Sequence, residues 1–277
     1  MKKQIFLQAF EDITKQINGE NEIFSLGFSD LDMMLGNTKN GSLITIGGRP
    51  SIGKTALAIC FCTNLLEQNK KVIYFSLEAS DYSLATRMIV NKSEVDLQKF
   101  RLKLTSEDDL EKLKQAAEFF DEKSFMIEDK TNLIVEDVIK LATETDADCI
   151  FIDYIQLMYM ERLENSAVEL NLAVKRLKDF ALQSGKNIFI ITQLSRAVER
   201  RSTRIPQISD IREVCALEEL SDVILLIYND SYYNREIAEH KDKAEIILAK
   251  NKLGPVGSFD IKYTNGIFKD GLVTDLF

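Results

Sequence analysis

Short runs of apolar residues, bounded by polar or small residues, recur along the chain. Continuous apolar runs rich in β-branched residues are typical of strands that are buried on both faces of a sheet. These patterns predict strands at residues 42–47, 71–75, 125–127, 148–153, 187–192, 222–228, 244–249 and 258–263.

Between most of these runs, apolar residues recur at helical spacing. The predicted helices cover residues 54–67, 81–91, 106–120, 133–143 and 164–184. Ser106, with Asp109 three residues later, is typical of a helix start. Strand–helix alternation indicates an α/β fold with a mainly parallel central sheet flanked by helices. The last strands follow one another without helices, which predicts an antiparallel C-terminal edge, and residues 196–209 are expected to form a loop.

The first residues carry a separate amphipathic pattern. Apolar residues recur at helical spacing between residues 3 and 17, and Asn18 and Gly19 end the pattern. We expect residues 1–22 to form a linker helix and hinge, and residues 23–277 to form one α/β domain. Such a helix can fold back on its own domain or lie in a groove of a neighbouring subunit. The periodicity alone favours the first arrangement.

Composition narrows the class of protein. Of the 277 residues, 45% are hydrophobic, and 35 basic against 44 acidic residues give a formal net charge of −9. This composition is typical of a globular chain rather than a disordered or low-complexity one. The longest comparable apolar stretch, residues 55–66, is too short to span a membrane, and no signal peptide opens the chain.

The cysteines show no pattern of a metal or disulfide framework. No pair has CxxC spacing, and His240 is the single histidine, so no zinc site is apparent. The pattern indicates buried free thiols in a reducing, cytoplasmic environment. The cysteines are Cys60, Cys62, Cys149 and Cys215.

The strongest chemical signal is GRPSIGKT at residues 48–55, which fits the phosphate-loop pattern GxxxxGK[ST]. Glycines let the loop wrap phosphate oxygens, while backbone N–H groups and the following helix supply positive potential. Lys54 is expected on the β- and γ-phosphates of ATP, and Thr55 on Mg²⁺. The expected nucleotide-binding residues are Gly48, Arg49, Pro50, Ser51, Ile52, Gly53, Lys54, Thr55 and Ala56.

Polar residues at three other strand ends complete such a site. Asp153 ends the run CIFID, where phosphate-loop NTPases usually hold Mg²⁺. Glu78 in FSLE would reach a water behind the γ-phosphate as a general base. Gln193 in IITQ can sense the γ-phosphate. Taken alone, an Asp at a strand end is more often a helix cap or turn residue, and Glu78 is equally a cap for the helix that begins near Asp81.

A basic cluster follows Gln193 in this acidic chain. It predicts contacts with a nucleic-acid backbone, with a solvated basic loop as the alternative. No aromatic residue interleaves the cluster, so base stacking is not indicated. The arginines are Arg196, Arg200, Arg201 and Arg204, with Arg212 shortly after.

The segments GRPSIGKT, FSLE, FIDYIQLM, ITQLSR, SDIRE and KNKLGPVG occur in this order. Together they resemble the RecA-like motor domain of DnaB-type replicative DNA helicases, from about Phe24 to the C-terminus. The resemblance implies a RecA-like P-loop NTPase fold and an ATPase that couples hydrolysis to 5′-to-3′ translocation on single-stranded DNA and to duplex unwinding. It also implies a ring, usually a hexamer, with ATP between subunits and with a primase and a helicase loader as partners.

The amphipathic start resembles the family's linker helix, which docks on the adjacent protomer. The family's usual N-terminal helical domain is missing, so we expect a fragment or a naturally short relative. The resemblance implies the roles given above for Lys54, Thr55, Asp153, Glu78 and Gln193, and it implies DNA contacts for Arg212 and Glu213 on a loop that faces the central channel.

The sequence departs from the family's pattern at two places: the segment expected to face the neighbouring subunit and the expected DNA-binding loop. Where the family usually has Lys-x-Arg, this chain has Lys250, Asn251 and Lys252. Lys252 stands at the arginine-finger position, and lysine cannot hold phosphate in a bidentate grip. Hydrolysis is then slow, or Lys250 carries more of the role. The family's Ser-Gly is replaced by Val214 and Cys215, and the Cβ of Cys215 can hinder approach to DNA phosphate.

Two other functions remain open at this point. One is a different RecA-like ring or filament ATPase, although the DIRE and KxKxGP segments speak against it. The other is an assembly module that binds ATP between subunits and turns it over slowly.

Overall fold

The computed structural model describes residues 6–7, 10–11, 14, 24–36, 40–96, 99, 102–158, 166–211, 213–233, 242–252 and 254–271. Most of the predicted linker helix and hinge, residues 1–22, lies outside this part of the chain, and so does His240. The residues that are described between positions 3 and 17 are helical, and Phe6 and Phe10 among them are exposed.

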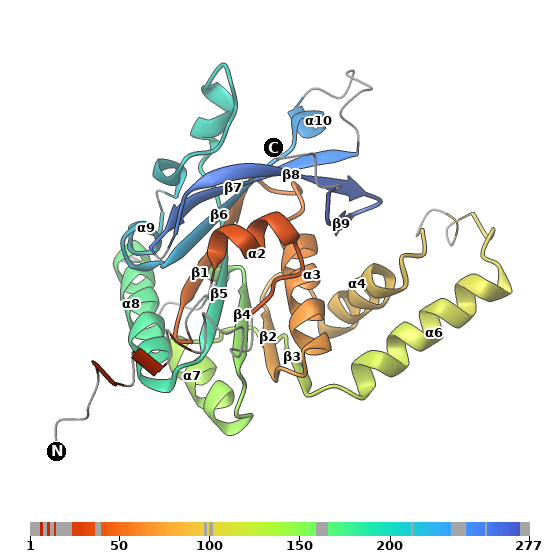
Figure 1. The fold of residues 1–277 in the computed structure, drawn as a ribbon, viewed down its shortest axis with the longest axis horizontal. Helices are drawn as coiled ribbons and strands as arrows, with labels where there is room; N and C mark the ends of the chain where they lie inside the picture. The colour runs from red at the N-terminus through yellow and green to blue at the C-terminus, as the bar shows by residue number, and fades with distance from the viewer. Residues whose placement is uncertain are drawn as a thin grey trace.

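Strands and helices alternate along the chain, as the apolar pattern predicts (Figure 1). The strands are β1 (Leu43–Gly48), β2 (Val72–Ser76), β3 (Phe125–Glu128), β4 (Cys149–Asp153), β5 (Asn187–Gln193), β6 (Val223–Tyr228), β7 (Lys243–Asn251), β8 (Gly257–Thr264) and β9 (Ile267–Lys269). The α-helices are α2 (Ser29–Leu35), α3 (Lys54–Glu67), α4 (Asp81–Ser93), α6 (Glu107–Asp121), α7 (Val135–Glu144), α8 (Ser166–Ser184), α9 (Cys215–Leu220) and α10 (Asp230–Tyr233). The 3₁₀ helices are η1 (Ile155–Leu157), η3 (Arg196–Arg200) and η4 (Ile208–Asp210).

These strands form one sheet in the order β3-β2-β4-β5-β1-β6-β7-β8-β9. Neighbours from β3 to β6 in this order pair in parallel. The last three strands add in antiparallel fashion. The helix described between β6 and β7, α10, has four residues, far fewer than a parallel crossover needs. The predicted α/β fold, mainly parallel with an antiparallel C-terminal edge, is confirmed.

Helices cover both faces of the sheet (Figure 1). Successive strand residues point to opposite faces, so Ile44 joins the apolar cluster under α3 while Leu43 joins the cluster under α8. Within the first cluster, the rings of Phe151 and Phe189 stack with centroids 4.3 Å apart. Burial of each such side chain contributes about 2 kcal/mol, which fixes the strand ends that form the site. Helices α4 and α6 extend beyond β3 as an arm (Figure 1).

The sequence pattern missed the shortest elements. Residues 196–209 were expected to form a loop, but they include η3 and most of η4. The pattern also gave no signal for α2, α9, α10 or β9. One or two turns of helix and a three-residue strand are too short to develop a periodicity.

Two local predictions have different outcomes. Ser106 caps α6 in a complete capping box with Asp109, as predicted. The expectation of buried thiols holds for the other three cysteines but is wrong for Cys215, which lies exposed at the start of α9. Among the helices of the described residues, none has both the length and the apolar content that crossing a bilayer demands.

Candidate nucleotide site

The predicted site residues lie together at one end of the sheet, where the carboxyl ends of the central parallel strands meet. Gly48 at the end of β1 pairs in register with Gln193 at the end of β5. Ser76 at the end of β2 pairs in register with Asp153 at the end of β4. Ligands of open α/β sheets bind outside this end, so the topology itself assembles the candidate site.

The phosphate loop depends on glycine at two positions. A Cβ on Gly48 would lie 2.7 Å from the side chain of Ile52, which is closer than packed atoms approach. Gly53 has φ of +112° and is the N-cap of α3, in a conformation that favours glycine. The loop therefore turns directly into the N-terminus of α3, whose free N–H groups can bind an anion.

Lys54 is buried at the base of this loop. Its ammonium donates a hydrogen bond to the carbonyl of Arg49 over 3.0 Å. Burial lowers the pKa of Lys54 to about 8, although the charges of Asp153 and Glu78 act in the opposite direction. No carboxylate of the described residues forms an ion pair with this buried ammonium, which is thus poised to bind an anion such as a phosphate.

Asp153 has one oxygen engaged and one free. Its Oδ2 accepts hydrogen bonds from Thr55 Oγ1 at 2.7 Å and from the hydroxyl of Tyr74 at 2.8 Å. Its Oδ1 is buried and has no hydrogen-bond partner in the described part of the chain. Burial raises the pKa of Asp153 despite these bonds. A free carboxylate oxygen beside a threonine hydroxyl is a donor set that fits Mg²⁺.

Glu78 lies in the same cavity as the phosphate loop. This cavity has a volume of about 520 Å³ and is lined by Lys54, Thr55, Glu78 and Asp153 together. The alternative role of Glu78 as a helix cap is wrong, because Ser80 caps α4 through a hydrogen bond from the amide of Ser83. The Glu78 carboxylate is thus exposed to the space where a phosphate chain would lie.

The far wall of the cavity comes from residues that the sequence analysis did not select. Tyr263, Asn265 and Gly266 line it from the β8–β9 hairpin, and Arg87 lines it from α4. Asn265 and Gly266 both have positive φ. An Asn-Gly pair between two strands is a strong hairpin signal, so the hairpin could have been found from sequence, although its place beside the phosphate loop could not.

Gln193 is held by its neighbours at the sheet edge. Its side chain contacts the hydroxyl of Tyr154. Gln156, which the sequence analysis also passed over, donates hydrogen bonds to Thr192 Oγ1 at 2.9 Å and to the carbonyl of Gln193 at 3.2 Å. The ends of β4 and β5 are therefore tied together beside the phosphate loop.

The guanidinium of Arg49 points away from the phosphate-binding face. Its Nε and Nη2 lie 2.8 and 2.6 Å from Oε1 of Glu199 in η3, and its Nη1 donates to the carbonyl of Leu194 over 2.6 Å. The side chain is 9% exposed. Arg49 therefore offers only its backbone to a nucleotide, while its side chain connects the phosphate loop with the basic cluster.

Two arginines of the basic cluster are engaged within the protein. Arg201 forms a bidentate pair with the buried Asp210, at 2.9 and 2.5 Å, and donates to the carbonyl of Ile205. This pairing raises the pKa of Arg201. Arg204 donates to the carbonyl of Tyr233 and lies over its ring. Both side chains thus hold the loop in shape.

Arg196 and Arg200 are exposed in η3, and Glu213 is exposed before α9. Arg212 lies outside the described residues. The segment between β5 and α9 projects from the body of the molecule near α10 (Figure 1). Among the candidate DNA-binding residues that the structure describes, Arg196, Arg200 and Glu213 are therefore the exposed ones, which a partner can reach.

Lys250 and Lys252 lie at the opposite end of the sheet, beside the amino ends of the parallel strands. Lys250 pairs in register with Ile224 near the start of β6, and the Lys252 ammonium bonds Asp222, whose Oδ2 accepts the amide of Leu43 at the start of β1. Leu43 and Gly48 are separated by the length of β1, about 17 Å. Neither lysine is placed to reach the phosphate loop of its own chain.

Comparisons with known proteins show the family to which this fold belongs. The family model for the DnaB-like helicase C terminal domain matches residues 24–269. The replicative DNA helicase DnaB of Geobacillus stearothermophilus is 33% identical over 270 residues, which are 94% of this chain and 59% of that protein. The chain thus spans less than two thirds of the length of this relative.

Two solved structures have the same fold. One, a separately solved ATPase domain, superposes with a TM-score of 0.88 at 29% identity, covering 96% of this chain and 98% of that one. The other, a DnaB-like replicative helicase described with its interactions with primase, gives a TM-score of 0.87 at 29% identity and covers 96% of this chain and 66% of that one. With the family model matched over almost the whole of the described domain, the chain belongs to the family of DnaB-like helicase C-terminal domains.

Proposed function

We propose that this chain is the ATP-hydrolysing motor domain of a replicative DNA helicase, which couples hydrolysis to translocation on single-stranded DNA and to unwinding. The observation that carries the proposal is the cavity in which a phosphate loop, an aspartate with a free oxygen and an exposed glutamate meet. The family supports the same activity, since its relatives are named replicative DNA helicases.

Each residue has a distinct part in this hydrolysis. Lys54 and the amides at the start of α3 bind and neutralise the phosphate chain. Thr55 and Asp153 are the residues that would hold Mg²⁺, which neutralises charge on the β- and γ-oxygens when bound. Glu78 accepts the proton of a water whose oxygen bonds to the γ-phosphorus as the bridging P–O bond breaks. Gln193 responds to the γ-phosphate beside Gly48.

The partners follow from the same proposal. ATP lies between subunits of a ring, usually a hexamer, and Lys250 and Lys252 of one subunit complete the site of the next. Residues 1–22 serve as a linker helix docked on the adjacent protomer. Arg196, Arg200 and Glu213, with Arg212, face single-stranded DNA. A primase and a helicase loader act with the ring in the cytoplasm, and one solved relative is described with primase.

One observation favours a second candidate function. The ammonium groups of Lys250 and Lys252 are both bound by groups of their own chain, the former by the carbonyls of Glu218 and Glu219. These contacts take up N–H donors that a phosphate of a neighbouring subunit would otherwise use, which would slow hydrolysis. The second candidate is therefore an ATP-binding assembly module with slow turnover.

Steady-state ATP hydrolysis with Mg²⁺, across protein concentration and with or without single-stranded DNA, tests the proposal. We expect turnover to rise with protein and again with DNA. We expect Glu78→Gln to lower kcat by about 10²–10⁴-fold while ATP binding is kept, because only the proton acceptor is removed. The matched control Glu144→Gln removes an exposed carboxylate on α7 and should hydrolyse ATP at the wild-type rate. Full turnover by Glu78→Gln would contradict the assignment, and low turnover indifferent to DNA would favour the assembly module.

A further inference from the structure

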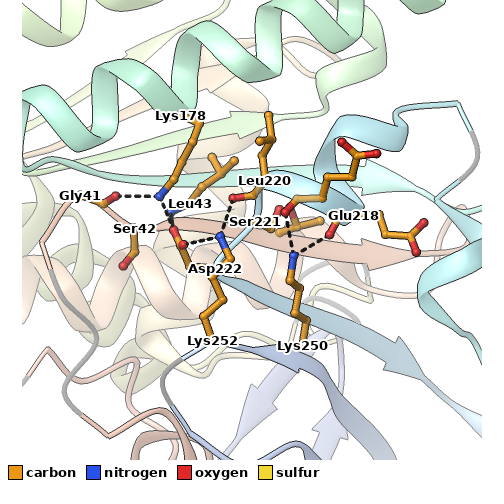
Figure 2. A network of polar contacts seen from close by, with 12 residues as sticks. Gly41, Ser42, Leu43, Lys178, Glu218, Leu220, Ser221, Asp222, Lys250 and Lys252 are labelled. Carbon is orange, nitrogen blue, oxygen red and sulfur yellow. Dashed lines mark hydrogen bonds and ion pairs between the residues drawn. The ribbon is translucent and has the colours of Figure 1, made fainter.

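Asp222 is the centre of a contact network that joins four parts of the chain (Figure 2). Its Oδ2 accepts hydrogen bonds from Lys178 of α8 at 2.5 Å and from the amide of Leu43 at 2.8 Å. Its Oδ1 accepts a hydrogen bond from Lys252, beyond the end of β7, at 2.9 Å. Both oxygens of one carboxylate are thus used, one toward the core and one toward the surface.

Burial differs sharply along this network. The side chains of Lys178 and Asp222 are 10% and 15% exposed, whereas that of Lys252 is 42% exposed. Burial alone would raise the pKa of Asp222, but hydrogen bonds from Lys178, the Leu43 amide and Lys252 bring it below its ordinary value. The carboxylate is therefore ionised and fixed in place from behind.

The charge balance explains why two lysines share one carboxylate. If Asp222 were paired with Lys252 alone, the pair would be neutral and would not attract an anion. Lys178 already neutralises Asp222, so the three groups together keep one positive charge. That charge lies on the exposed member, Lys252, where a phosphate of another molecule can meet it.

The geometry also compensates for the flexibility of lysine. An ammonium has three N–H donors on a flexible stem, without the fixed fork of arginine. Lys252 uses one donor on Asp222 and a second on the carbonyl of Leu220 at 3.4 Å. The backbone amide of Lys252 also donates to the carbonyl of Asp222 at 2.9 Å. One N–H remains for a phosphate oxygen, on a side chain that is held at both ends.

We propose that Asp222, backed by Lys178, is the positioning residue of Lys252, and that it sets the direction and the net charge with which Lys252 enters the ATP site of a neighbouring subunit. This inference rests on the proposed function, because it needs ATP hydrolysis at a site that a second copy completes. It adds a role for Asp222 and Lys178, neither of which lines the candidate nucleotide cavity. It also accounts for how a lysine can stand where the family has arginine.

A double-mutant cycle on the full chain tests the inference, with kcat for DNA-stimulated hydrolysis, Kd for a fluorescent ATP analogue and urea unfolding measured for each variant. We expect Asp222→Asn to lower kcat about 10-fold while the Kd stays at the wild-type value. We expect Lys252→Ala to lower kcat at least as much. The double variant should be within about twofold of Lys252→Ala, because Asp222 acts only through Lys252.

The matched control is Asp260→Asn. Asp260 pairs with Lys243 at the other end of β7, over 2.5 Å between side chains that are both more than half exposed. This pair has the same chemistry but no link to Lys252, so kcat should not change. If Asp222→Asn does not fold, Lys178→Met tests the same inference. In this variant Asp222 neutralises Lys252, so kcat should fall. It should fall only in chains that keep Lys252.

The outcomes separate the inference from the proposed function. If the costs of Asp222→Asn and Lys252→Ala multiply, Asp222 has only a structural role and the inference is overturned. If Lys252→Ala hydrolyses ATP like the wild type, the inference is overturned while the proposed function stands. If the wild-type chain with DNA hydrolyses no ATP under any assembly condition, the proposed function fails and the inference falls with it.

Discussion

Lys54 and Asp153 lie in one cavity, and burial shifts both toward their neutral forms. The pKa of Lys54 is lowered to about 8 and that of Asp153 is raised, in each case mainly because burial disfavours the charged form. Under the proposed function, the phosphate chain of a bound nucleotide would stabilise protonated Lys54, and its cation would stabilise ionised Asp153.

Lys54 therefore predicts a pH dependence of nucleotide affinity. Below pH 8 the lysine is protonated before ATP arrives, so affinity should be nearly constant. Above pH 8 binding must take up a proton, because the phosphates raise the pKa again. Kd should then rise by up to about tenfold per pH unit. Fluorescence titrations from pH 7 to 9.5 measure this slope. Lys54→Met should bind weakly with no slope over this range, and a flat wild-type profile would contradict the pKa of the buried lysine.

At the scale of elements, the segment between β5 and α9 is shaped by side-chain contacts rather than by long helices. Arg201 and Asp210 join two parts of this segment, and Arg49 joins η3 within it to the phosphate loop. Asp210 is almost fully buried, and its side chain in the pair is 2% exposed. A loop held in this way can transmit a change at the phosphate loop to its exposed arginines.

Alanine substitutions of Arg200 and Arg201 should therefore have opposite effects, although the two residues are neighbours. Arg201→Ala leaves the buried Asp210 carboxylate without its guanidinium partner, although the amide of Gln207 still donates to it, and should lower the free energy of unfolding by about 2 kcal/mol. Arg200→Ala should leave stability within about 0.5 kcal/mol and weaken single-stranded DNA binding. The slope of log K against log salt should then fall by about 0.7, because one DNA phosphate is no longer neutralised. Urea unfolding and DNA titrations at several salt concentrations measure both. Equal stability of the two variants would contradict the structural role of Arg201.

These elements also show what the sequence could predict and why. Strand ends and the phosphate loop follow from local patterns, so the residues from Gly48 to Thr55, together with Asp153 and Glu78, could be named and expected at one edge. Side-chain partners such as Glu199 for Arg49 and Lys178 for Asp222 are far apart in sequence. No periodicity encodes such pairs, because they depend on how loops pack after the sheet has formed. The arginines of the basic cluster looked equivalent in sequence for the same reason.

At the scale of the whole molecule, the two groups of residues that are proposed to act in hydrolysis lie at opposite ends of the strands. The phosphate loop, Asp153 and Glu78 follow the carboxyl ends of the parallel strands. Lys250 and Lys252 lie beside the starts of β1 and β6. Under the proposed function, a subunit would then use these lysines only on another subunit. An interface between unlike ends is heterologous and closes into a ring when the rotation permits.

This arrangement predicts that two impaired variants restore each other. Lys252→Ala subunits keep Glu78, and Glu78→Gln subunits keep Lys252, so each supplies what the other lacks. In a random one-to-one assembly, about a quarter of the interfaces should unite an intact Glu78 with an intact Lys252. Single-turnover phosphate release with DNA, measured after dissociated subunits are mixed, should recover to about that fraction of the wild-type amplitude. Mixing Glu78→Gln with the Glu78→Gln/Lys252→Ala double variant is the control and should restore nothing. If no mixing ratio of the two single variants releases more phosphate than the sum of the separate variants, each ATP site is complete within one chain. The distance between Lys252 and the phosphate loop of the same chain then has no role in catalysis.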